Sequence, residues 1–359
     1  MPVTPTIIAE AGVNHNGELA LAIELVDVAA AANVDVVKFQ TFRSNDLAAI
    51  SATKAAYQTE TTDATESQLD MLSRLELSRD EQIQLKRYCD DKKLRFLSTP
   101  FDIGSIDFVV DGLGVDTIKV SSGDLTNGPF LLYAARKKRP IILSTGMGSI
   151  EEIRVALSVI AFGYNHNHGW PDTETLAKLG THEQLMGSLN HRVTLLHAVT
   201  EYPAPDNEMN LRSMETLKRT FGLSVGLSDH SMGIAAPIAA TALGAGMIEK
   251  HFTLSNKLPG PDHKASLEPG ELVDMTEAVH AVASMLGDGE KGPTESERKN
   301  IPVARRSLVA ARPIKAGEII DETSLTAKRP GTGLSPMKYW DLLGTVASKD
   351  FTADEVFEK

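Results

Sequence analysis

An α/β fold is predicted by this sequence: a (β/α)8 TIM barrel followed by a small C-terminal domain of short strands and turns. Short β-rich runs alternate with helical stretches eight times, and polar residues stand at the C-terminal end of nearly every run. After residue 286 this alternation stops, and a polar, glycine-rich stretch is followed by short strand-like runs and turns. Eight alternating units are typical of a parallel barrel with an outer ring of helices. An open, doubly wound sheet is the alternative, and the count of eight favours the barrel.

The predicted strands are short and lie one helix apart. They cover residues 7–13, 36–42, 95–101, 117–122, 141–145, 193–199, 224–228 and 247–252. The predicted helices cover residues 19–32, 79–92, 103–112, 129–138, 150–162, 211–220, 233–244 and 268–286. Since neighbouring parallel strands need a crossover connection, a helix after each strand agrees with parallel pairing throughout.

Two segments fall outside this alternation. Residues 44–77 form a long excursion after the second strand, and on the upper face of a barrel such a segment would cover the active site. Residues 163–190 intrude before the sixth strand and contain His166 and His168 among Asn, Gly, Trp and Pro. A loop of this composition needs no metal, so we expect no metal site there.

We predict three parts along the chain: a catalytic barrel over residues 1–286, a linker over 287–302 and a separate domain over 303–359. The linker segment is polar and rich in glycine, which is typical of a connection between domains. The last part is small, so docking onto the barrel or onto a partner subunit would help to stabilise it.

The composition argues against several classes of partner. With 48 acidic and 36 basic residues among 359, the formal net charge is −12, which disfavours nucleic acid or an acidic membrane as the main partner. A single cysteine, Cys89, cannot form an internal disulfide, and we expect a core residue rather than a nucleophile. The N-terminus lacks a signal-peptide pattern and no apolar run approaches the roughly 20 residues that span a bilayer, so we expect a soluble, cytoplasmic protein.

Two histidines stand at the ends of the last two predicted strands. The run V-G-L-S-D-H ends in His230 and the run I-E-K-H ends in His251, with one helix-sized piece between them. Because the carboxyl ends of parallel strands meet at one edge of the sheet, we expect these imidazoles to be neighbours. They suit a divalent metal ion that must also hold water or substrate, and two structural, hydrogen-bonded histidines are the alternative. His197, inside the sixth strand, is expected to be a core histidine.

Two lysines inside predicted buried strands indicate an anion site. Lys38 and Lys119 are flanked by apolar residues, and a buried ammonium is costly unless an anion meets it. Together with strand-end hydroxyls they predict a pocket for a phosphate or a carboxylate. The hydroxyls belong to Ser122, Ser144 and Ser228. The alternative is that both lysines pair only with the carboxylates of Glu10 and Glu249.

With these residues in view, ten short motifs in order along nearly the whole chain resemble the sialic acid synthase family. They are I-A-E-A-G-V-N-H-N-G at 8–17, V-V-K-F-Q-T-F at 36–42, L-S-T-P-F-D at 97–102, I-K-V-S-S-G-D at 118–124, I-L-S-T-G-M at 142–147, T-E-Y-P-A-P at 200–205, G-L-S-D-H at 226–230, E-K-H-F-T at 249–253, P-G-P-D-H at 259–263 and K-R-P-G-T-G at 328–333. No single motif is decisive, but ten in register are highly specific.

The resemblance implies a barrel followed by an antifreeze-like (SAF) domain, in a domain-swapped homodimer whose C-terminal domain reaches the partner's active site. It also implies condensation of phosphoenolpyruvate with an N-acylated amino sugar and release of phosphate. The first expectation is an N-acetylneuraminate synthase, which uses N-acetylmannosamine. The alternative is a legionaminic or pseudaminic acid synthase, which uses a diacetamido hexose.

The resemblance also implies roles for individual residues. A divalent ion, with manganese expected before magnesium or cobalt, would be held by His230 and His251. Phosphoenolpyruvate would be held by Lys38, Lys119, Ser122, Ser144 and Ser228. The sugar and water side would be lined by Glu10, Gln40, Asp124, Tyr202 and Asp262, and Arg329 of the partner subunit would meet the N-acyl group. The expected catalytic residues are Glu10, Lys38, Lys119, His230 and His251, with Glu10 stabilising a cationic centre or orienting the attacking water.

Some features depart from the family pattern or favour another function. Asp124 stands where many relatives have glutamate, Ala198 replaces a frequent cysteine, and the 163–190 insertion is longer than in many relatives. A phosphoenolpyruvate-dependent synthase acting on a sugar phosphate is a second enzyme hypothesis, and it needs a further basic cluster. An ice-binding module in the C-terminal part is disfavoured by charged residues such as Lys315 and Glu318.

Overall fold

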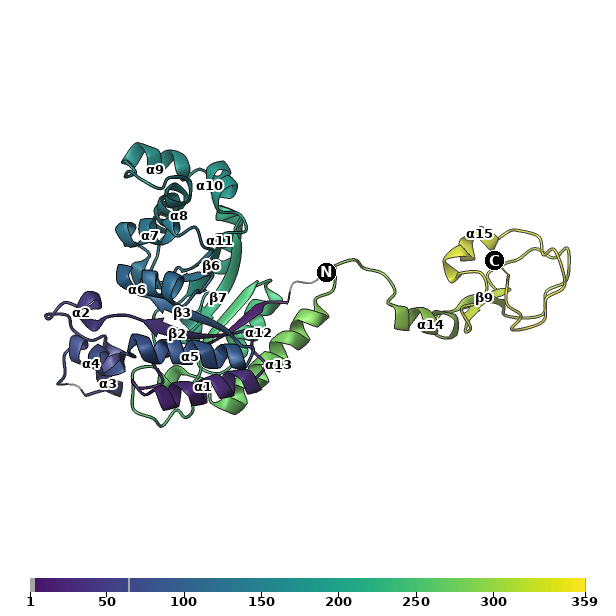
Figure 1. Cartoon of the computed structure of the whole chain (residues 1–359). Coiled ribbons are helices and arrows are strands. Elements are labelled where there is room, and N and C mark those ends of the chain that lie inside the picture. Colours follow the sequence, from purple (N-terminus) through teal and green to yellow (C-terminus); the bar gives the residue numbers. More distant parts are fainter. Residues whose placement is uncertain (1–3, 64, 359) are drawn as a thin grey trace. The chain divides into compact units, whose positions relative to one another are not determined.

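The computed structural model describes residues 4–63 and 65–358 and divides the chain into two compact units, Met1–Asp288 and Gly289–Lys359 (Figure 1). Helix α14 (Glu295–Ala304) begins in the segment that we predicted as a linker and ends two residues beyond it. It begins with a capping box, in which the Thr294 side chain accepts from the backbone N–H of Glu297 and the Glu297 carboxylate accepts from the backbone N–H of Thr294. This local signal explains why a polar segment is helical.

The first unit is a nearly closed barrel of eight parallel strands, which confirms the predicted fold. The strands are β1 (Thr6–Gly12), β2 (Val36–Thr41), β3 (Arg95–Pro100), β4 (Ile118–Val120), β5 (Ile141–Ser144), β6 (Val193–Ala198), β7 (Ser224–Asp229) and β8 (Met247–His251). Their order is β3-β2-β1-β8-β7-β6-β5-β4, and β3 contacts β4 to bring the ring close to closure. The first and last strands of the sequence are therefore neighbours.

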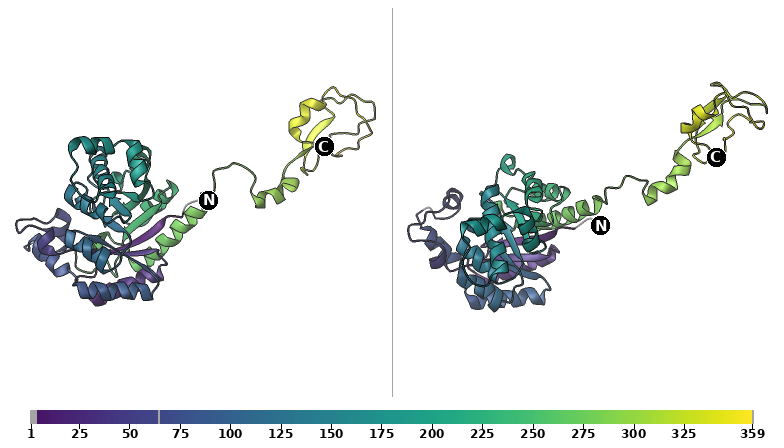
Figure 2. Two further views of the ribbon diagram at one scale, coloured as in Figure 1. Left: turned by 45° about the horizontal axis from the view of Figure 1, so that its top comes forward. Right: turned by 90° about the horizontal axis from the view of Figure 1, so that it is seen from above.

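Helices surround the strands in both further views of the ribbon (Figure 2). Those that follow strands are α1 (Leu19–Ala31), α5 (Arg79–Asp91), α6 (Ile103–Asp107), α7 (Gly128–Arg136), α8 (Ile150–Asn165), α11 (Ser213–Phe221), α12 (Ala235–Ala242) and α13 (Pro269–Met285). Capping boxes begin α5 at Ser78 and α8 at Ser149, and Gly222, in the left-handed region at φ 69°, ends α11. Local sequence thus determines where several of these helices begin or end.

The barrel core contains the apolar residues of strands and inner helix faces. Strand β1 is buried along nearly its whole length, as expected for a strand covered on both sides. Cys89 lies in this core, where burial raises the pKa of its thiol to about 12, so it remains protonated near neutral pH. Among residues 4–63 and 65–358, no helix is long and apolar enough to cross a membrane.

The excursion at 44–77 contains three helices: α2 (Ser44–Leu47), α3 (Ala56–Thr61) and α4 (Gln68–Leu75). Figure 1 shows them grouped together at one edge of the barrel unit. The insertion before β6 contains α9 (Thr173–Leu179) and α10 (His182–Leu189), both of which contact α8. Helix α8 continues to Asn165, past the predicted end at 162, because Gly163 and Tyr164 are buried and Gly163 packs closely against Ala135.

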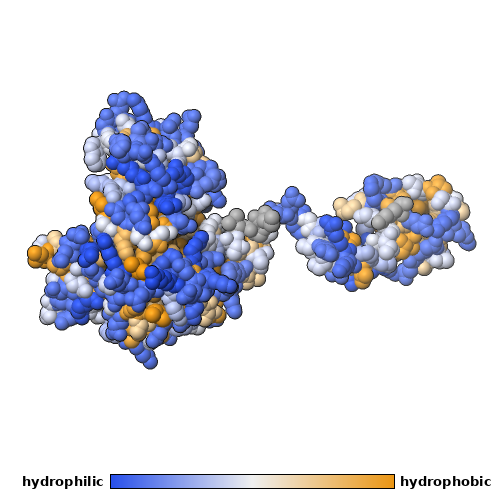
Figure 3. Space-filling view, in the orientation of Figure 1, coloured by the Kyte–Doolittle hydropathy of each residue, from blue (hydrophilic) through white to orange (hydrophobic). Residues whose placement is uncertain are grey.

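The second unit is a small domain with one antiparallel pair of strands, β9 (Ser307–Ala310) and β10 (Leu325–Lys328). It also contains a 3-10 turn at Pro336–Lys338 and helix α15 (Tyr339–Leu342). Its own core is built from buried apolar residues, namely Leu308, Ala310, Ile314, Ile320, Leu325, Ala347, Phe351 and Phe357. Hydrophilic residues dominate the face of both units drawn in Figure 3, in agreement with the charged composition.

Candidate active site

A cavity of about 390 Å³ opens at the C-terminal ends of the barrel strands. Most of the predicted site residues line it, although they come from distant parts of the sequence. Those that do are Glu10, Lys38, Gln40, Lys119, Ser122, Ser144, Tyr202, Ser228, His230, His251 and Asp262. The strand register brings them together, because Glu10 of β1 lies opposite both Lys38 of β2 and His251 of β8.

The floor of the cavity is a buried cluster of two ammonium groups and two carboxylates. Lys38 Nζ lies 2.7 Å from Glu10 Oε2 and 3.5 Å from Glu249 Oε2. Lys119 Nζ lies 3.3 Å from Glu249 Oε1. All four side chains are at most 5% exposed. The pairing that we considered as the alternative is thus present, and it leaves both ammonium groups facing the cavity.

The two carboxylates have different acidities because of their positions. Burial, reinforced by repulsion from Glu249, outweighs the attraction of Lys38 and raises the pKa of Glu10 to about 7. Burial also opposes the ionisation of Glu249, but Lys119 and Lys38 together outweigh it and lower its pKa to about 2. Burial lowers the pKa of Lys119, and Glu10 and Glu249 raise the pKa of Lys38 despite its burial. Glu249 is therefore the permanent counter-ion, and Glu10 can exchange a proton near neutral pH.

Hydroxyl groups surround the two lysines. Lys119 Nζ donates to Ser144 Oγ at 2.8 Å, and Lys38 Nζ donates to Thr99 Oγ1 at 3.0 Å. Ser228 Oγ donates to Glu249 Oε1 at 2.7 Å. This arrangement of ammonium and hydroxyl donors is suited to the oxygens of a phosphate or carboxylate.

A close backbone approach adds to this donor set. The Gly146 N–H donates to Ser122 Oγ at 2.9 Å, and a Cβ at Gly146 would lie 2.4 Å from Thr200 Oγ1 and 2.8 Å from Ser122 Oγ. Any larger residue at 146 would therefore displace these hydroxyls. Thr200 Oγ1 is buried and has no hydrogen-bond partner within the described part of the chain, so it is available to a ligand.

The two histidines meet at the same end of the barrel, with ring centroids 5.5 Å apart. His230 Nδ1 donates to the Val199 carbonyl oxygen at 2.6 Å, which leaves its Nε2 as an electron-pair donor in the neutral ring. Burial lowers the pKa of His230 to about 4 and holds that of His251 well below its usual value. Both rings are therefore neutral at pH 7, as metal ligands must be.

One ring nitrogen of His251 has no hydrogen-bond partner among the described residues. Its Nδ1 is buried without a hydrogen bond to any residue in 4–63 or 65–358, and the nearest carboxylate oxygen, Asp262 Oδ2, lies 3.9 Å away. Within these same residues, no group of three or more His, Cys, Asp or Glu side chains is arranged to hold a metal. The two imidazoles thus fit a divalent ion only as a partial donor set, which water or substrate must complete.

Tyr202 closes the histidine side of the cavity. Its ring centroid lies 4.1 Å from that of His230, 5.5 Å from that of His251 and 5.1 Å from that of Tyr57. Burial raises the pKa of Tyr202 well above its usual value, so its hydroxyl stays protonated. Burial also raises the pKa of Asp262 to about 6, and this carboxyl can therefore exchange a proton close to neutral pH.

One predicted site residue of the barrel unit, Asp124, is not among the residues that line this cavity. Asp124 lies half-buried in the 3-10 turn Ser122–Asp124, where its Oδ1 accepts from Asn127 Nδ2 at 3.0 Å instead of lining the wall. Arg329 belongs to the second unit, where its Nε donates to the Ala304 carbonyl oxygen at 3.0 Å. Its role therefore stays a prediction.

Sequence reasoning missed several residues that line the cavity. Thr99 lies near the C-terminal end of β3 and Thr200 stands two residues beyond the end of β6, so their places at the strand ends were the available signal. Tyr57 comes from the excursion, where an aromatic residue within a polar segment was the only hint. His197 donates from Nε2 to the Met209 carbonyl oxygen at 2.7 Å, so this histidine is satisfied within the core as expected.

Comparisons with known proteins match both units. The NeuB family model matches residues 25–291, and the SAF domain model matches residues 305–359. N,N'-diacetyllegionaminic acid synthase of Campylobacter jejuni is 45% identical over 353 residues, which cover 98% of each chain. The synthase of the same name from Legionella pneumophila is 39% identical and is matched over 98% of this chain and 92% of its own. The crystal structure of N-acetylneuraminic acid (sialic acid) synthetase from Leptospira borgpetersenii, in complex with citrate, superposes with a TM-score of 0.66 at 31% identity, covering 83% of this chain and 90% of that one.

Proposed function

Because this chain belongs to the NeuB family of nonulosonic acid synthases, we propose that it condenses phosphoenolpyruvate with an acylamino hexose and releases phosphate. The relatives at 45% and 39% identity are named as diacetyllegionaminic acid synthases, so they favour a 2,4-diacetamido hexose as the acceptor. N-acetylmannosamine, our first expectation from the sequence, is the second candidate. The sialic acid synthetase structure at 31% identity supports it.

One observation carries the proposal: two buried ammonium groups, two carboxylates of unequal acidity and two neutral imidazoles converge on one cavity. Lys38 and Lys119, with Ser144, Ser228 and Thr200 around them, are suited to the phosphate and carboxylate of phosphoenolpyruvate. Among the described residues that line the cavity, no arginine accompanies these two lysines. This gives no support to the alternative of a sugar-phosphate acceptor, which needs a second basic cluster.

A divalent metal ion fits the histidine side, and we propose manganese before magnesium or cobalt. The neutral His230 and His251 rings and the unpartnered Nδ1 of His251 support this assignment. When bound, such an ion acts as a Lewis acid that polarises the aldehyde of the sugar.

The side chains of this protein then account for the remaining steps. The π-electron pair of the phosphoenolpyruvate double bond forms the new C–C bond to the aldehyde carbon, and the aldehyde oxygen takes up the displaced electron pair. Water adds to the cationic carbon left behind, and Glu10, whose pKa is about 7, accepts the proton that the water loses. Lys38 and Lys119 neutralise the phosphate until its C–O bond breaks. The remaining hydroxyl then loses its proton to the departing phosphate as the keto group forms, and the proton taken up by Glu10 passes to the alkoxide of the sugar.

Other residues position the sugar. Gln40, Tyr202 and Asp262 line the cavity beside the histidines and are proposed to bind sugar hydroxyls. Asp124 is proposed to do so through a bridging water, since its Oδ1 is occupied by Asn127. Arg329 of the partner subunit is proposed to meet an N-acyl group in a domain-swapped homodimer.

The test is incubation with phosphoenolpyruvate, Mn²⁺ and either N-acetylmannosamine or 2,4-diacetamido hexoses. Phosphate release and the mass of the nine-carbon product are measured. A product with phosphate released in equal amount is expected, with the higher kcat/KM for a diacetamido sugar. Absence of product with every acylamino hexose would refute the function. A higher kcat/KM for N-acetylmannosamine would refute only the choice of acceptor.

A further inference from the structure

One wall of the cavity is formed entirely by the excursion after β2. None of the roles proposed above for the lysines, carboxylates and histidines involves this wall. We call it the 44–77 wall, and its residues are Leu47, Tyr57, Gln58, Gln68, Met71, Leu72 and Leu75. We propose that this wall is the subsite for the second acylamino substituent of the sugar and sets the preference for diacetamido over monoacetamido hexoses. The inference rests on the proposed function and goes beyond it by assigning specificity to named residues.

The chemistry of the wall differs from that of the floor. Four of its residues present aliphatic or thioether groups, whereas the floor presents ammonium groups, carboxylates and hydroxyls. A sugar hydroxyl placed against an apolar wall loses hydrogen bonds to water without replacement. An acetamido methyl gains from burial there.

The wall also offers amide groups to the polar part of the substituent. Gln58 Oε1 accepts from the backbone N–H of Ala55 at 3.0 Å. The group that Gln58 can present to the cavity is consequently its Nε2 donor. A donor next to an apolar surface matches the carbonyl oxygen and methyl group of an acylamino substituent.

The wall is held firmly by a small core of its own. Met71 is 1% exposed and Leu75 is 7% exposed, and they pack with Val13 and Phe42 of the barrel. Helix α4 also approaches the turn after β1 so closely that a Cβ at Gly17, where φ is +78°, would lie 2.2 Å from the Arg74 carbonyl oxygen. A packed wall of this kind has a defined shape and can discriminate between substituents.

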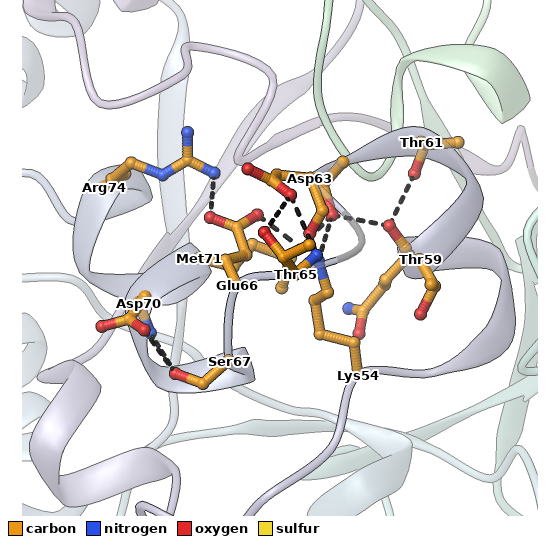
Figure 4. Close-up of polar contacts among 12 residues, drawn as sticks. Lys54, Thr59, Thr61, Asp63, Thr65, Glu66, Ser67, Asp70, Met71 and Arg74 are labelled. Atoms are coloured by element: carbon orange, nitrogen blue, oxygen red, sulfur yellow. Dashed lines mark hydrogen bonds and ion pairs between the residues drawn. The ribbon is translucent and has the colours of Figure 1, made fainter.

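Polar contacts around Lys54, which we call the Lys54 cluster, join parts of the same segment (Figure 4). Lys54, whose side chain is 3% exposed, donates to Thr62 Oγ1 at 2.8 Å and to the Asp63 carbonyl oxygen, and its Nζ lies 3.4 Å from Glu66 Oε1. Glu66 in turn pairs with Arg74 of α4. The Lys54 cluster joins the segment before α3 to α4, so the wall residues between them keep their relative positions.

The wall contacts the reacting end of the site through aromatic rings. Tyr57 of α3 lies 5.1 Å from Tyr202, which lies 4.1 Å from His230 (centroid to centroid). A sugar whose aldehyde is directed to the histidines therefore extends along this wall. Since Arg329 of the partner subunit is proposed for the acyl group that all candidate sugars share, the wall is assigned to the substituent that N-acetylmannosamine lacks.

Two substitutions test the wall with little risk to folding. Leu72 is only half-buried, and Leu72→Ala shortens the apolar surface. Gln58→Glu keeps a side-chain oxygen for the Ala55 N–H but replaces the amide donor with an acceptor. Thr59→Ala, an exposed position on the same helix, is the matched control. Each variant is assayed with both sugars at saturating phosphoenolpyruvate, and the KM for phosphoenolpyruvate is measured separately.

We expect Leu72→Ala and Gln58→Glu each to lower kcat/KM for the 2,4-diacetamido hexose about tenfold. The value for N-acetylmannosamine should change less than about threefold, and the KM for phosphoenolpyruvate should not change. Thr59→Ala should change neither sugar. Equal losses for both sugars, or no loss for either, would overturn the inference while leaving the function intact. If wild-type protein turns over neither sugar, the function fails and the inference fails with it.

Discussion

A buried ion pair between the two histidine-bearing strands leads to a stability prediction. Lys250 Nζ lies 2.6 Å from Asp229 Oδ2, and both side chains are fully inaccessible. Lys250 also donates to the Ser231 carbonyl oxygen, and Asp229 Oδ1 accepts from the backbone N–H of Ser231 at 2.9 Å and from its hydroxyl at 2.7 Å. Every polar atom of this pair thus has a partner, and the pair joins β7 to β8 beside His230 and His251.

Lys250→Met should be strongly destabilising because it leaves Asp229 charged and without its counter-ion in the core. Removing one partner of such a pair costs about 3–5 kcal/mol, a large part of the ~5–15 kcal/mol that stabilises a typical domain. Adding Asp229→Asn removes the stranded charge while an amide oxygen still accepts from Ser231. The double variant should therefore recover at least ~1 kcal/mol relative to Lys250→Met.

Urea unfolding followed by circular dichroism measures these changes through the transition of the barrel unit. Lys178→Met is the control, because the Lys178–Glu174 pair has a similar separation of 2.7 Å but is 74% and 78% exposed, and its loss should cost less than ~1 kcal/mol. A free energy of unfolding for Lys250→Met as close to wild type as that of the control would refute the reasoning. Recovery by the double variant distinguishes a stranded charge from simple loss of packing.

Further predictions concern metal binding, phosphoenolpyruvate, the partner subunit and acid. His251→Ala should abolish Mn²⁺ binding measured by electron paramagnetic resonance and lower kcat at least about a hundredfold. The circular dichroism spectrum should not change, and unaltered Mn²⁺ binding would contradict the metal site. Lys119→Ala should raise the KM for phosphoenolpyruvate about tenfold or more and leave that of the sugar nearly unchanged, and the reverse pattern would contradict the anion pocket. Arg329→Ala should raise the KM for acylamino sugars several-fold without changing the KM for phosphoenolpyruvate. Mixing the Arg329→Ala protein with an inactive barrel variant should restore activity only if Arg329 of the partner subunit acts across a dimer. Stability should fall between pH 6.5 and 4, because burial lowers the pKa of four histidines and the unfolded chain binds these protons first, at about 2 kcal/mol at pH 5 for an imidazole with a folded pKa of about 4. The four are His15, His230, His251 and His263, and together they outweigh Glu10 and Asp262, whose raised pKa values act in the opposite direction. Urea midpoints independent of pH over this range would contradict this prediction.

The barrel could be predicted because the periodicity of the sequence and the physics of parallel strands give the same answer. Each β-rich run ends close to where its strand ends, and the polar residues that follow meet at one edge of the sheet. The neighbouring positions of His230 and His251 follow from that rule alone. That His251 Nδ1 has no hydrogen-bond partner among residues 4–63 and 65–358 could not be inferred, since it depends on side-chain geometry.

The excursion shows where sequence reasoning reached its limit. That residues 44–77 cover the site followed from their place after β2, but which side chains face the cavity depends on how α3 and α4 fold against the barrel. Met71 and Tyr57 both line the cavity, yet Met71 packs with Val13 and Phe42 whereas Tyr57 contacts Tyr202. Such contacts are long-range, and no local pattern encodes them.

The unequal carboxylates of the floor follow from geometry and not from residue type. Glu10 and Glu249 carry the same chemical group, but Glu249 lies near both lysines and also accepts from Ser228, whereas Glu10 has one close lysine and a carboxylate neighbour. Of two carboxylates that share two ammonium groups, the one with fewer close lysines takes up a proton more readily. In the proposed complex, phosphoenolpyruvate would add further negative charge to the same lysines, which would strengthen that competition and make Glu10 more basic at the step in which water must lose its proton. On the proposed function, the same electrostatics that bind the substrate would therefore also raise the basicity of Glu10.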